Sequence, residues 1–260
     1  MDFLAGPTGG LSYHAAALRY RQTLWQPFLG SVENWLSQTW NPKSRDLVIF
    51  GPSAGWTLPA GFLARFDSVI GIEPDPIGRT LFRYRFRSAK QNPGIKKLQL
   101  LSSENLLPWF SPRPQVFSDF LAQHAESAIL FSNLLGQIPL LHPDRALAAM
   151  IDKQELFIES LRGREWASYH DLLSGRAQVL PTAPKKLSAQ TAIAILTDLV
   201  PFSDFAEEIF PAGSQIVDHD TLWLSAPDSG AGRTSTELAT WQIRPGVHHL
   251  VGFVHFSPFA

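Results

Sequence analysis

The chain has 260 residues, of which 45% are hydrophobic and 17% are charged. This composition provides enough apolar material for a full core and too little charge for a disordered chain, so we expect one main domain with added segments. A formal net charge of −1 excludes a strong overall field that attracts nucleic acid or an anionic membrane. The absence of cysteine excludes disulfides, thiolate–metal sites and a cysteine nucleophile.

The N-terminal segment, Met1 to Gly10, has no basic stretch followed by an apolar run, so no signal peptide is expected. No apolar run approaches about 18 residues, and no transmembrane helix is expected either. We therefore expect a cytoplasmic protein with no membrane partner, and the sequence predicts no particular oligomeric state.

Residues Leu11 to Trp40 are predicted to be helical, and breaks at Pro27 and Gly30 divide them into two helices. Asn41-Pro42 ends this segment. Aromatic residues such as Tyr13 either pack these helices onto the rest of the protein or help to cover a ligand. We assign residues 1–45 to an N-terminal helical extension and residues 46–260 to an α/β domain.

Short apolar runs alternate with helical segments through the middle of the chain. The runs suit buried parallel strands, because strands covered on both faces are apolar throughout. The predicted strands are Leu47–Phe50, Ser68–Ile72, Lys97–Leu101, Ser127–Phe131 and Trp166–Leu173. The predicted helices are Leu58–Phe66, Pro76–Lys90, Val116–His124, Asp144–Arg162 and Ala189–Leu199. This alternation predicts a doubly wound, mostly parallel sheet.

The C-terminal part changes character. The segments Gln215–Leu224, Leu238–Arg244 and His248–Phe256 are β-rich, and Pro245-Gly246 is a turn signal. We expect an antiparallel hairpin at one edge of the sheet.

A glycine-containing loop follows the first predicted strand. It reads Gly51-Pro52-Ser53-Ala54-Gly55-Trp56, and the second strand ends at Glu73. In doubly wound sheets, ligands bind at the carboxyl ends of the strands, and an acid about 20 residues beyond such a loop accepts hydrogen bonds from ribose hydroxyls. The pattern predicts a nucleotide site, although an ordinary turn with a surface glutamate is the simpler alternative. A dinucleotide loop has three glycines, so the two present here disfavour a nicotinamide-dependent oxidoreductase.

Four segments together resemble the class I S-adenosylmethionine-dependent methyltransferases. They are Gly51–Gly55, Ile72-Glu73-Pro74-Asp75, Ser103-Glu104-Asn105-Leu106 and Ser132-Asn133-Leu134. The resemblance covers roughly Leu47 to Leu173 and implies a Rossmann-like methyltransferase fold that binds S-adenosylmethionine. The cofactor-binding residues that it implies are Gly51, Pro52, Ser53, Ala54, Gly55, Glu73, Pro74, Ser102, Ser103, Glu104, Asn105 and Asn133.

Two positions depart from the family pattern. The acid that usually stands two residues before the first glycine, and helps to position the methionine amino group, is replaced by Ile49. The adenine-contacting acid after the third strand is replaced by Ser102, unless Glu104 takes the role.

Three polar residues are candidates for catalysis. Asn133 follows the fourth strand, where the resemblance implies a position beneath the sulfonium and the acceptor. His170 and Asp171 lie near the end of the fifth strand, where a histidine serves as a base and an acid orients it. A second cluster of this kind is Asp218-His219-Asp220. Each of these groups has a purely structural interpretation as well.

The same residue types invite a metal interpretation, which the spacing disfavours. No helix carries two histidines four residues apart, and adjacent strand residues such as His248 and His249 point to opposite faces. We therefore expect no metal site.

The expected partner is a small-molecule or protein acceptor. A basic run from Arg79 to Lys97 suits phosphate contacts, but the near-neutral net charge favours a solvated helix face and no nucleic acid. The leading hypothesis is a methyltransferase, and the alternative is a catalytically inactive protein of the same fold that binds or regulates.

Overall fold

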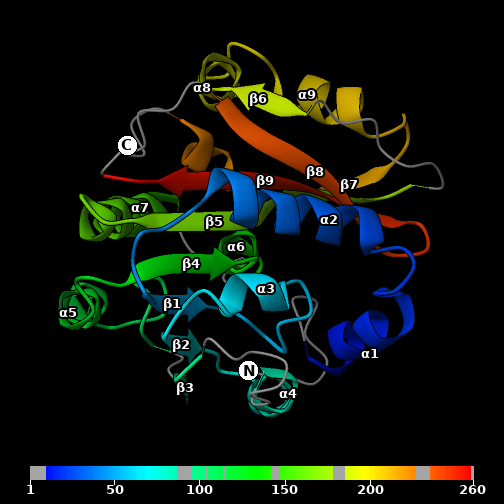
Figure 1. The fold of residues 1–260 in the computed structure, drawn as a ribbon. Helices are drawn as coiled ribbons and strands as arrows, with labels where there is room; N and C mark the ends of the chain where they lie inside the picture. Colours follow the sequence, from blue (N-terminus) through cyan, green and yellow to red (C-terminus); the bar gives the residue numbers. More distant parts are fainter. Residues whose placement is uncertain are drawn as a thin grey trace.

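The computed structural model describes residues 10–86, 95–102, 105–113, 115–141, 147–177, 185–226 and 235–258. Its described part contains a nine-stranded sheet with helices on both faces (Figure 1). The strands are β1 (Asp46–Phe50), β2 (Ser68–Ile72), β3 (Lys97–Leu101), β4 (Ala128–Ser132), β5 (Trp166–Arg176), β6 (Lys186–Ser188), β7 (Gln215–Asp218), β8 (Ser235–Arg244) and β9 (Val247–Phe256).

The first five strands form the parallel half of the sheet, in the order β3-β2-β1-β4-β5. Their pairs are all parallel, and Val48 of β1 is aligned with Ile70 of β2 on one side and with Ile129 of β4 on the other. The chain therefore moves outward from β1 to β3 and then returns to the opposite side of β1. The gap between the ends of β1 and β4 is the topological switch point, where ligands bind in such sheets. The predicted doubly wound, mostly parallel α/β fold is confirmed.

The C-terminal strands form the antiparallel half. β9 pairs with β5 on one side and with β8 on the other, and β6 pairs with β8 at the edge. The turn between β8 and β9 is the predicted Pro245-Gly246, where Gly246 has a φ of 70°. The hairpin prediction is confirmed, whereas the continuous β prediction for Gln215–Leu224 is wrong. There β7 pairs with the end of β5, and a 3-10 helix follows at Leu222–Ser225.

The described helical elements are α1 (Leu11–Tyr20), α2 (Gln26–Asn34), a π-helix η1 (Trp35–Thr39), α3 (Ala60–Leu63), α4 (Pro76–Phe86), α5 (Gln115–Gln123), a 3-10 helix η2 (Leu135–Gln137), α6 (Ile138–Leu141), α7 (Leu147–Leu161), α8 (Ala189–Leu196), α9 (Phe202–Ile209) and a 3-10 helix η3 (Leu222–Ser225). Among these described elements no helix is long and apolar enough to cross a membrane.

The predicted N-terminal helices exist, but the break between them was misplaced. α1 ends at Tyr20, Pro27 lies in the first turn of α2, and Gly30 lies inside α2. A proline in the first helical turn costs little, because its missing N–H has no partner there in any helix. The break therefore precedes the proline. The helix predicted at Leu58–Phe66 is also shorter than expected, because a run of turns occupies the residues before Ala60.

Two main cores lie on the two faces of the sheet. One face packs against α1, α2, η1, α3 and α4 and is rich in aromatic side chains, including Trp25, Phe28 and Trp241. The other face packs against α5 and α7 through residues such as Phe117 and Phe157. A third cluster joins α8 and α9 to the C-terminal strands. Residues of α1 and α2 share a core with the sheet, and Figure 1 shows α2 in front of the sheet and α1 to the right of the strands. The domain division at residue 45 stays a prediction.

Candidate functional site

The loop after β1 turns sharply at the switch point. Gly51, Ser53 and Gly55 have φ angles of 67°, 49° and 66°, in the left-handed region that glycine adopts most easily. The Gly51 N–H donates to the Ile72 carbonyl at 2.9 Å, which ties the start of the loop to the end of β2. A Cβ atom at Gly55 would lie 2.4 Å from the Phe86 ring, so this position requires glycine for packing as well. The sequence-predicted loop is thus a tight, specifically packed turn.

Glu73 holds this loop through its carboxylate. The Ser53 N–H donates to Glu73 Oε2 at 2.6 Å, and the Asp75 N–H donates to Oε1 at 2.9 Å. The side chain is buried, and burial raises its pKa to about 7, even though both backbone hydrogen bonds and Arg79 act to lower it. A carboxylate can accept about four hydrogen bonds, so about two acceptor positions are left for a ligand.

Helix α4 begins immediately beyond Glu73. Asp75 Oδ1 accepts the Ile77 N–H at 2.9 Å and caps the first turn. Gly78 brings the helix against the loop, because a Cβ atom there would lie 3.2 Å from the Ser53 carbonyl carbon. The Arg79 guanidinium donates to the Glu73 and Pro74 carbonyls at 2.6 and 2.7 Å. The turn from Glu73 to Asp75 is therefore fixed from both sides.

Helix α1 is fastened over the same loop by a chain of hydrogen bonds. The Trp56 indole N–H donates to Nδ1 of His14 at 2.9 Å, and Nε2 of His14 lies 2.9 Å from Asp75 Oδ2. Because an indole N–H can only donate, Nδ1 must accept, and Nε2 carries the proton that it donates to Asp75. Arg85 adds to this contact: it donates to the Ala54 carbonyl at 2.5 Å and lies over the Trp56 ring.

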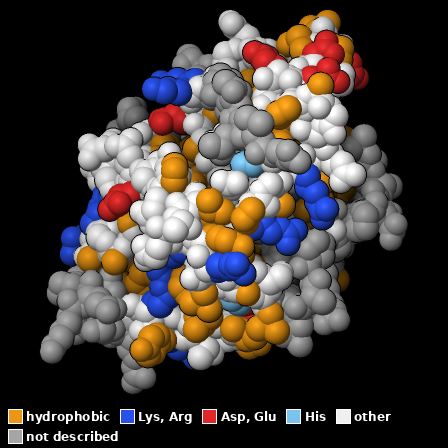
Figure 2. Space-filling model, turned by 90° about the vertical axis from the view of Figure 1, so that its right-hand side faces the viewer, with side chains coloured by type: hydrophobic (Ala, Val, Ile, Leu, Met, Phe, Trp, Pro, Cys, Tyr) orange, Lys and Arg blue, Asp and Glu red, His pale blue; other side chains and the backbone are white. Residues whose placement is uncertain are grey.

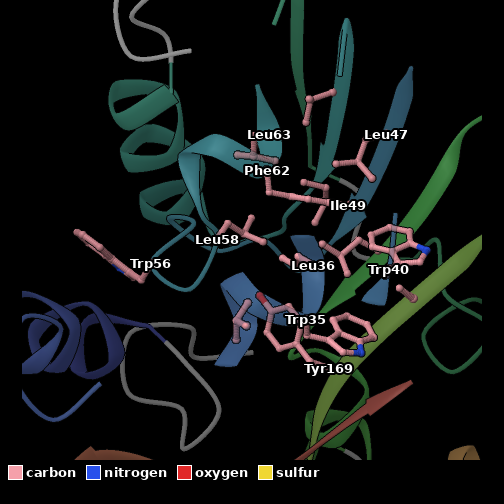
Figure 3. Close-up of a cluster of buried hydrophobic side chains, with 14 of the residues drawn as sticks. Trp35, Leu36, Trp40, Leu47, Ile49, Trp56, Leu58, Phe62, Leu63 and Tyr169 are labelled. Carbon is pink, nitrogen blue, oxygen red and sulfur yellow. The ribbon is translucent and has the colours of Figure 1, made fainter. Parts of the chain in front are cut away.

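Ile49 lies in the core and offers the site no polar group. Ile49 is fully buried on the face of the sheet that packs against α2, η1 and α3. Its neighbours there include Leu36, Leu58 and Phe62 (Figure 3). An acid at this position would be buried without a partner, which would lower the free energy of unfolding by roughly several kcal/mol. The apolar residue therefore suits its surroundings and leaves the family's usual amino-group contact unfilled.

The remaining residues implied in cofactor binding lie around the loop and the end of β3. Pro52 and Ala54 are buried in the loop, and Pro74 is half-buried in the turn after β2. Ser102 and Asn105 are exposed beyond β3, whereas Ser103 and Glu104 lie outside the described residues. Their contacts with an adenine stay a prediction.

Asn133 lies at the end of β4, next to the switch point. Its φ is 51°, its N–H donates to the Tyr169 carbonyl at 2.8 Å, and its side-chain Nδ2 lies 3.3 Å from Asp171 Oδ2. Leu134 fills the space beside Gly51, where an added Cβ atom would approach it to 2.9 Å. Asn133 therefore bonds β5, and its neighbour Leu134 packs against the glycine loop.

The structure brings Asn133 and Asp171 together but does not bring His170 to Asp171. His170 is fully buried on the opposite face of β5, where its Nδ1 lies 3.0 Å from the Ser168 hydroxyl. Neighbouring residues of a strand point to opposite faces, so the pairing of base and acid in sequence is not a pairing in space. The catalytic role of His170 stays a prediction.

Asp171 instead faces two other histidines. Its Oδ1 lies 3.1 Å from His249 Nδ1, and ligand-type atoms of Asp171, His219 and His249 all lie within 4.8 Å of one another. Burial acts to raise the pKa of Asp171, but His249, His219 and Asn133 together hold it below its ordinary value. His219 thus belongs to this group, whereas its sequence neighbours Asp218 and Asp220 are exposed.

Tyr13 of α1 packs against the aromatic rings of His14, Trp25 and Trp241. Burial raises the pKa of its phenol well above the ordinary range, the nearby Tyr169 and Asp171 raise it further, Arg85 lowers it, and Glu73 adds a smaller raising effect. The sequence left open whether the aromatic residues of α1 pack the helix or cover a ligand, and the ring contacts of Tyr13 are packing contacts.

Figure 2 shows the right-hand side of Figure 1, where the carboxyl ends of β1 and β4 lie. Hydrophobic side chains gather over the middle of this face with Lys and Arg side chains beside them, and acidic side chains gather near its upper right edge. The surface around the candidate site is therefore partly apolar and partly cationic.

No family model matches the chain, and no curated protein matches it. The solved structures with some similarity include methyltransferases in complex with S-adenosylmethionine or S-adenosylhomocysteine. The N-methyltransferase NodS from Bradyrhizobium japonicum, in complex with S-adenosylhomocysteine, is 10% identical over 93% of this chain and 95% of its own, with a TM-score of 0.41. The glycopeptide N-methyltransferase MtfA, complexed with S-adenosylmethionine, is 13% identical over 87% of this chain and 93% of its own, with a TM-score of 0.38. Similarity of this degree does not by itself assign a function.

Proposed function

We propose that the chain binds S-adenosylmethionine at the carboxyl ends of β1 and β2 and transfers its methyl group to a small molecule or a protein side chain. The observation that carries this proposal is the position of Glu73. Its carboxylate is buried at the switch point, is held by the Ser53 and Asp75 N–H groups, and keeps acceptor capacity for two more donors. Two vicinal ribose hydroxyls supply that pair of donors.

The form of the loop favours S-adenosylmethionine over a dinucleotide. A pyrophosphate is usually bound at a helix N-terminus that starts directly from the glycine loop. Here the loop is followed by turns, and the four-residue helix α3 starts only at Ala60. A sulfonium cofactor has no phosphate and needs no such helix, so the geometry suits the cofactor without phosphates.

The acceptor is expected on the side of β4 and β5. Asn133 and Asp171 lie there. Methyl transfer from a sulfonium is an in-line displacement, for which the protein mainly supplies positioning. A base is needed only where the acceptor must lose a proton. The residues at the ends of β4 and β5 therefore serve mainly to orient the acceptor.

A second candidate is a protein that binds the cofactor without transferring the methyl group. Ile49 favours it, because a fully buried isoleucine removes the usual acidic contact with the methionine amino group. Looser positioning of the methionine half lowers the rate of transfer more than the affinity for the adenosine half.

The test has two parts. First, the melting temperature is measured with S-adenosylmethionine, S-adenosylhomocysteine and NAD⁺, since any ligand of the native state raises stability. Second, the chain is incubated with S-adenosylmethionine that carries a labelled methyl group and with extracts of metabolites and proteins. A melting shift with both sulfur compounds and label in an acceptor support the proposal. A shift without label supports the second candidate, and a shift with NAD⁺ alone contradicts both.

A further inference from the structure

We propose that Asp171, His219 and His249 form a binding site for a divalent transition-metal ion in the middle of β5, just beyond the carboxyl end of the neighbouring strand β4. One carboxylate and two imidazoles converge there, with ligand-type atoms that all lie within 4.8 Å of one another. Asp171 and His219 are buried, and His249 is partly buried. This inference concerns a part of the protein on the other side of the switch point from Glu73, and it does not depend on the proposed function.

The contact between Asp171 and His249 has the spacing of two ligands rather than the geometry of a hydrogen bond. Asp171 Oδ1 and His249 Nδ1 are 3.1 Å apart, yet neither atom has a hydrogen-bond partner within the described residues. The two buried atoms form an ion pair with each other when His249 is protonated, and a cation shared between them would satisfy the same carboxylate oxygen with a neutral imidazole. Two donor atoms that share one cation in neighbouring coordination positions lie about 3 Å apart, as ligand distances of about 2.0–2.2 Å require.

The outer contacts of the cluster are those that orient metal ligands. His219 Nδ1 lies 2.6 Å from the Gly136 carbonyl oxygen, which can only accept, so Nδ1 carries the proton and Nε2 keeps its lone pair. The other oxygen of Asp171 faces the Asn133 amide at 3.3 Å. A backbone carbonyl behind a histidine and an amide behind a carboxylate fix the directions in which these two side chains point.

The strand register explains how residues far apart in the sequence meet here. Asp171 is paired with Val251, and His249 lies two residues from Val251 on β9, so Asp171 and His249 share one face of the sheet. The β-bulge between Asp171 and Leu173 then places Ser174 opposite His249. The Ser174 hydroxyl lies 2.8 Å from Nε2 of His219 and donates to its lone pair, so an ion bound at this nitrogen would replace that hydrogen bond.

The donor set selects the class of ion. Two imidazoles and one carboxylate suit Zn²⁺, Fe²⁺, Co²⁺ and similar ions, whereas Mg²⁺ and Ca²⁺ prefer oxygen ligands alone. Three protein ligands leave at least one coordination position open, as in catalytic rather than closed structural sites. An ion at this position would face the region in which the acceptor of the proposed function is expected, and an oxygen or nitrogen of that acceptor is a suitable fourth ligand.

The experiment measures metal binding by the full chain in the absence of any cofactor. The protein is stripped with a chelator and dialysed, and Zn²⁺ and Co²⁺ are titrated by calorimetry, with the visible spectrum of Co²⁺ as a second readout. We expect one ion per chain and a Co²⁺ spectrum typical of nitrogen and oxygen ligands, because the chain has no cysteine. The variants His249→Ala, His219→Ala and Asp171→Asn should each weaken binding by at least about tenfold.

The matched control is His124→Ala. His124 follows α5 near Asp46 and Lys97, at the amino ends of the strands, and its removal should leave metal affinity unchanged. Circular dichroism and melting curves identify any variant that fails to fold, and His249→Gln, which keeps the size of the side chain, then replaces His249→Ala. Binding below one ion per chain, or a loss shared equally by His124→Ala, contradicts the metal site. Metal binding without cofactor binding, or the reverse, separates this inference from the proposed function.

Discussion

The two ends of the candidate site are built in different ways. Around β1 and β2, Glu73 contacts residues from the same strand–loop–strand unit, and backbone N–H groups satisfy its carboxylate. Around β5 and β9, Asp171 contacts His249 and His219 from distant segments, and its Oδ1 has no hydrogen-bond partner within the described residues. At the first end, the Glu73 carboxylate accepts two backbone hydrogen bonds and can accept about two more. At the second end, three side chains bring metal-ligand atoms within 4.8 Å of one another. Under the two proposals above, one end receives hydroxyl donors and the other receives a cation.

The largest expected effect comes from changing the first end through Glu73→Gln. The amide NH₂ would face a backbone N–H in place of an acceptor oxygen, and the remaining oxygen cannot serve both ribose hydroxyls. We expect the affinity for S-adenosylhomocysteine to fall about 100-fold, or about 2.7 kcal/mol, in calorimetric titrations. The matched control is Asp67→Asn at the amino end of β2, where a partly buried acid pairs with Arg45 and Lys96, and it should leave the affinity unchanged. Equal affinities for wild type and Glu73→Gln would remove Glu73 from the binding site.

The second-largest effect is expected from Tyr169, whose hydroxyl connects β5 to the segment after the glycine loop and to β4. It lies 2.8 Å from the Thr57 hydroxyl and also bonds Ser132, and burial raises its pKa to about 12. Tyr169→Phe should lower the free energy of unfolding by about 1–3 kcal/mol, because two buried hydroxyls lose a shared partner. Denaturant unfolding measures the change, and Tyr84→Phe at an exposed position provides the control, with an expected change within about 0.5 kcal/mol. A similar change in both variants would show that Tyr169 does not connect the two ends energetically.

The pKa of Glu73 predicts a pH dependence that the second end should not share. Ribose hydroxyls bind the ionised carboxylate, and the pKa of Glu73 in the free protein is about 7. The affinity for adenosine, which has no titrating group in this range, should therefore rise about tenfold from about pH 6 to about pH 8. Fluorescence or calorimetric titrations across this range would show the increase, and a flat profile would mean that the bound ligand does not contact the carboxylate.

The same shift also affects the free protein. Because burial raises the folded-state pKa of Glu73 from its ordinary value of 4.5 to about 7, the folded chain binds more protons than the unfolded chain between these two values. This group's contribution to stability therefore falls as the pH rises from about 4.5 to about 7. Denaturant midpoints of wild type and Glu73→Gln, compared at both ends of this window, measure that contribution.

The smallest expected effect concerns the cover that α1 provides for the first end. His14→Phe removes the hydrogen bonds to Asp75 and Trp56 but keeps an aromatic ring in place. We expect the free energy of unfolding to fall by about 1 kcal/mol. Backbone hydrogen exchange should become faster in α1, while the exchange rates in β1 and β4 stay unchanged. His124→Phe is the control for a histidine outside the site. Unchanged exchange in α1 would show that packing alone holds the helix over the loop.

The sequence predicted the first end well because its signals are local. Buried parallel strands are continuous apolar runs, so the segments that became β1 to β5 were recognisable, and the glycine loop and Glu73 follow directly from their ends. The short helix α3 was overestimated, since the turns after Gly55 occupy the place where a longer helix was expected. The helix α9 and the edge strand β6 were not predicted at all.

The second end could not be predicted from local patterns. The pairing of His170 with Asp171 was the natural prediction for two adjacent polar residues, but strand geometry places them on opposite faces. The meeting of Asp171 with His249 depends on the register between β5 and β9, and the position of Ser174 depends on a bulge in β5. Neither the register nor the bulge has a signature in the residues themselves.

The most direct test of the central claim is a calorimetric titration of the wild-type chain with S-adenosylhomocysteine, with NAD⁺ titrated in parallel. We predict one binding site per chain with a dissociation constant in the micromolar range for S-adenosylhomocysteine, about −8 kcal/mol, and no measurable binding of NAD⁺. The absence of binding at millimolar S-adenosylhomocysteine, or tighter binding of NAD⁺, would contradict the account of the loop and Glu73 given above.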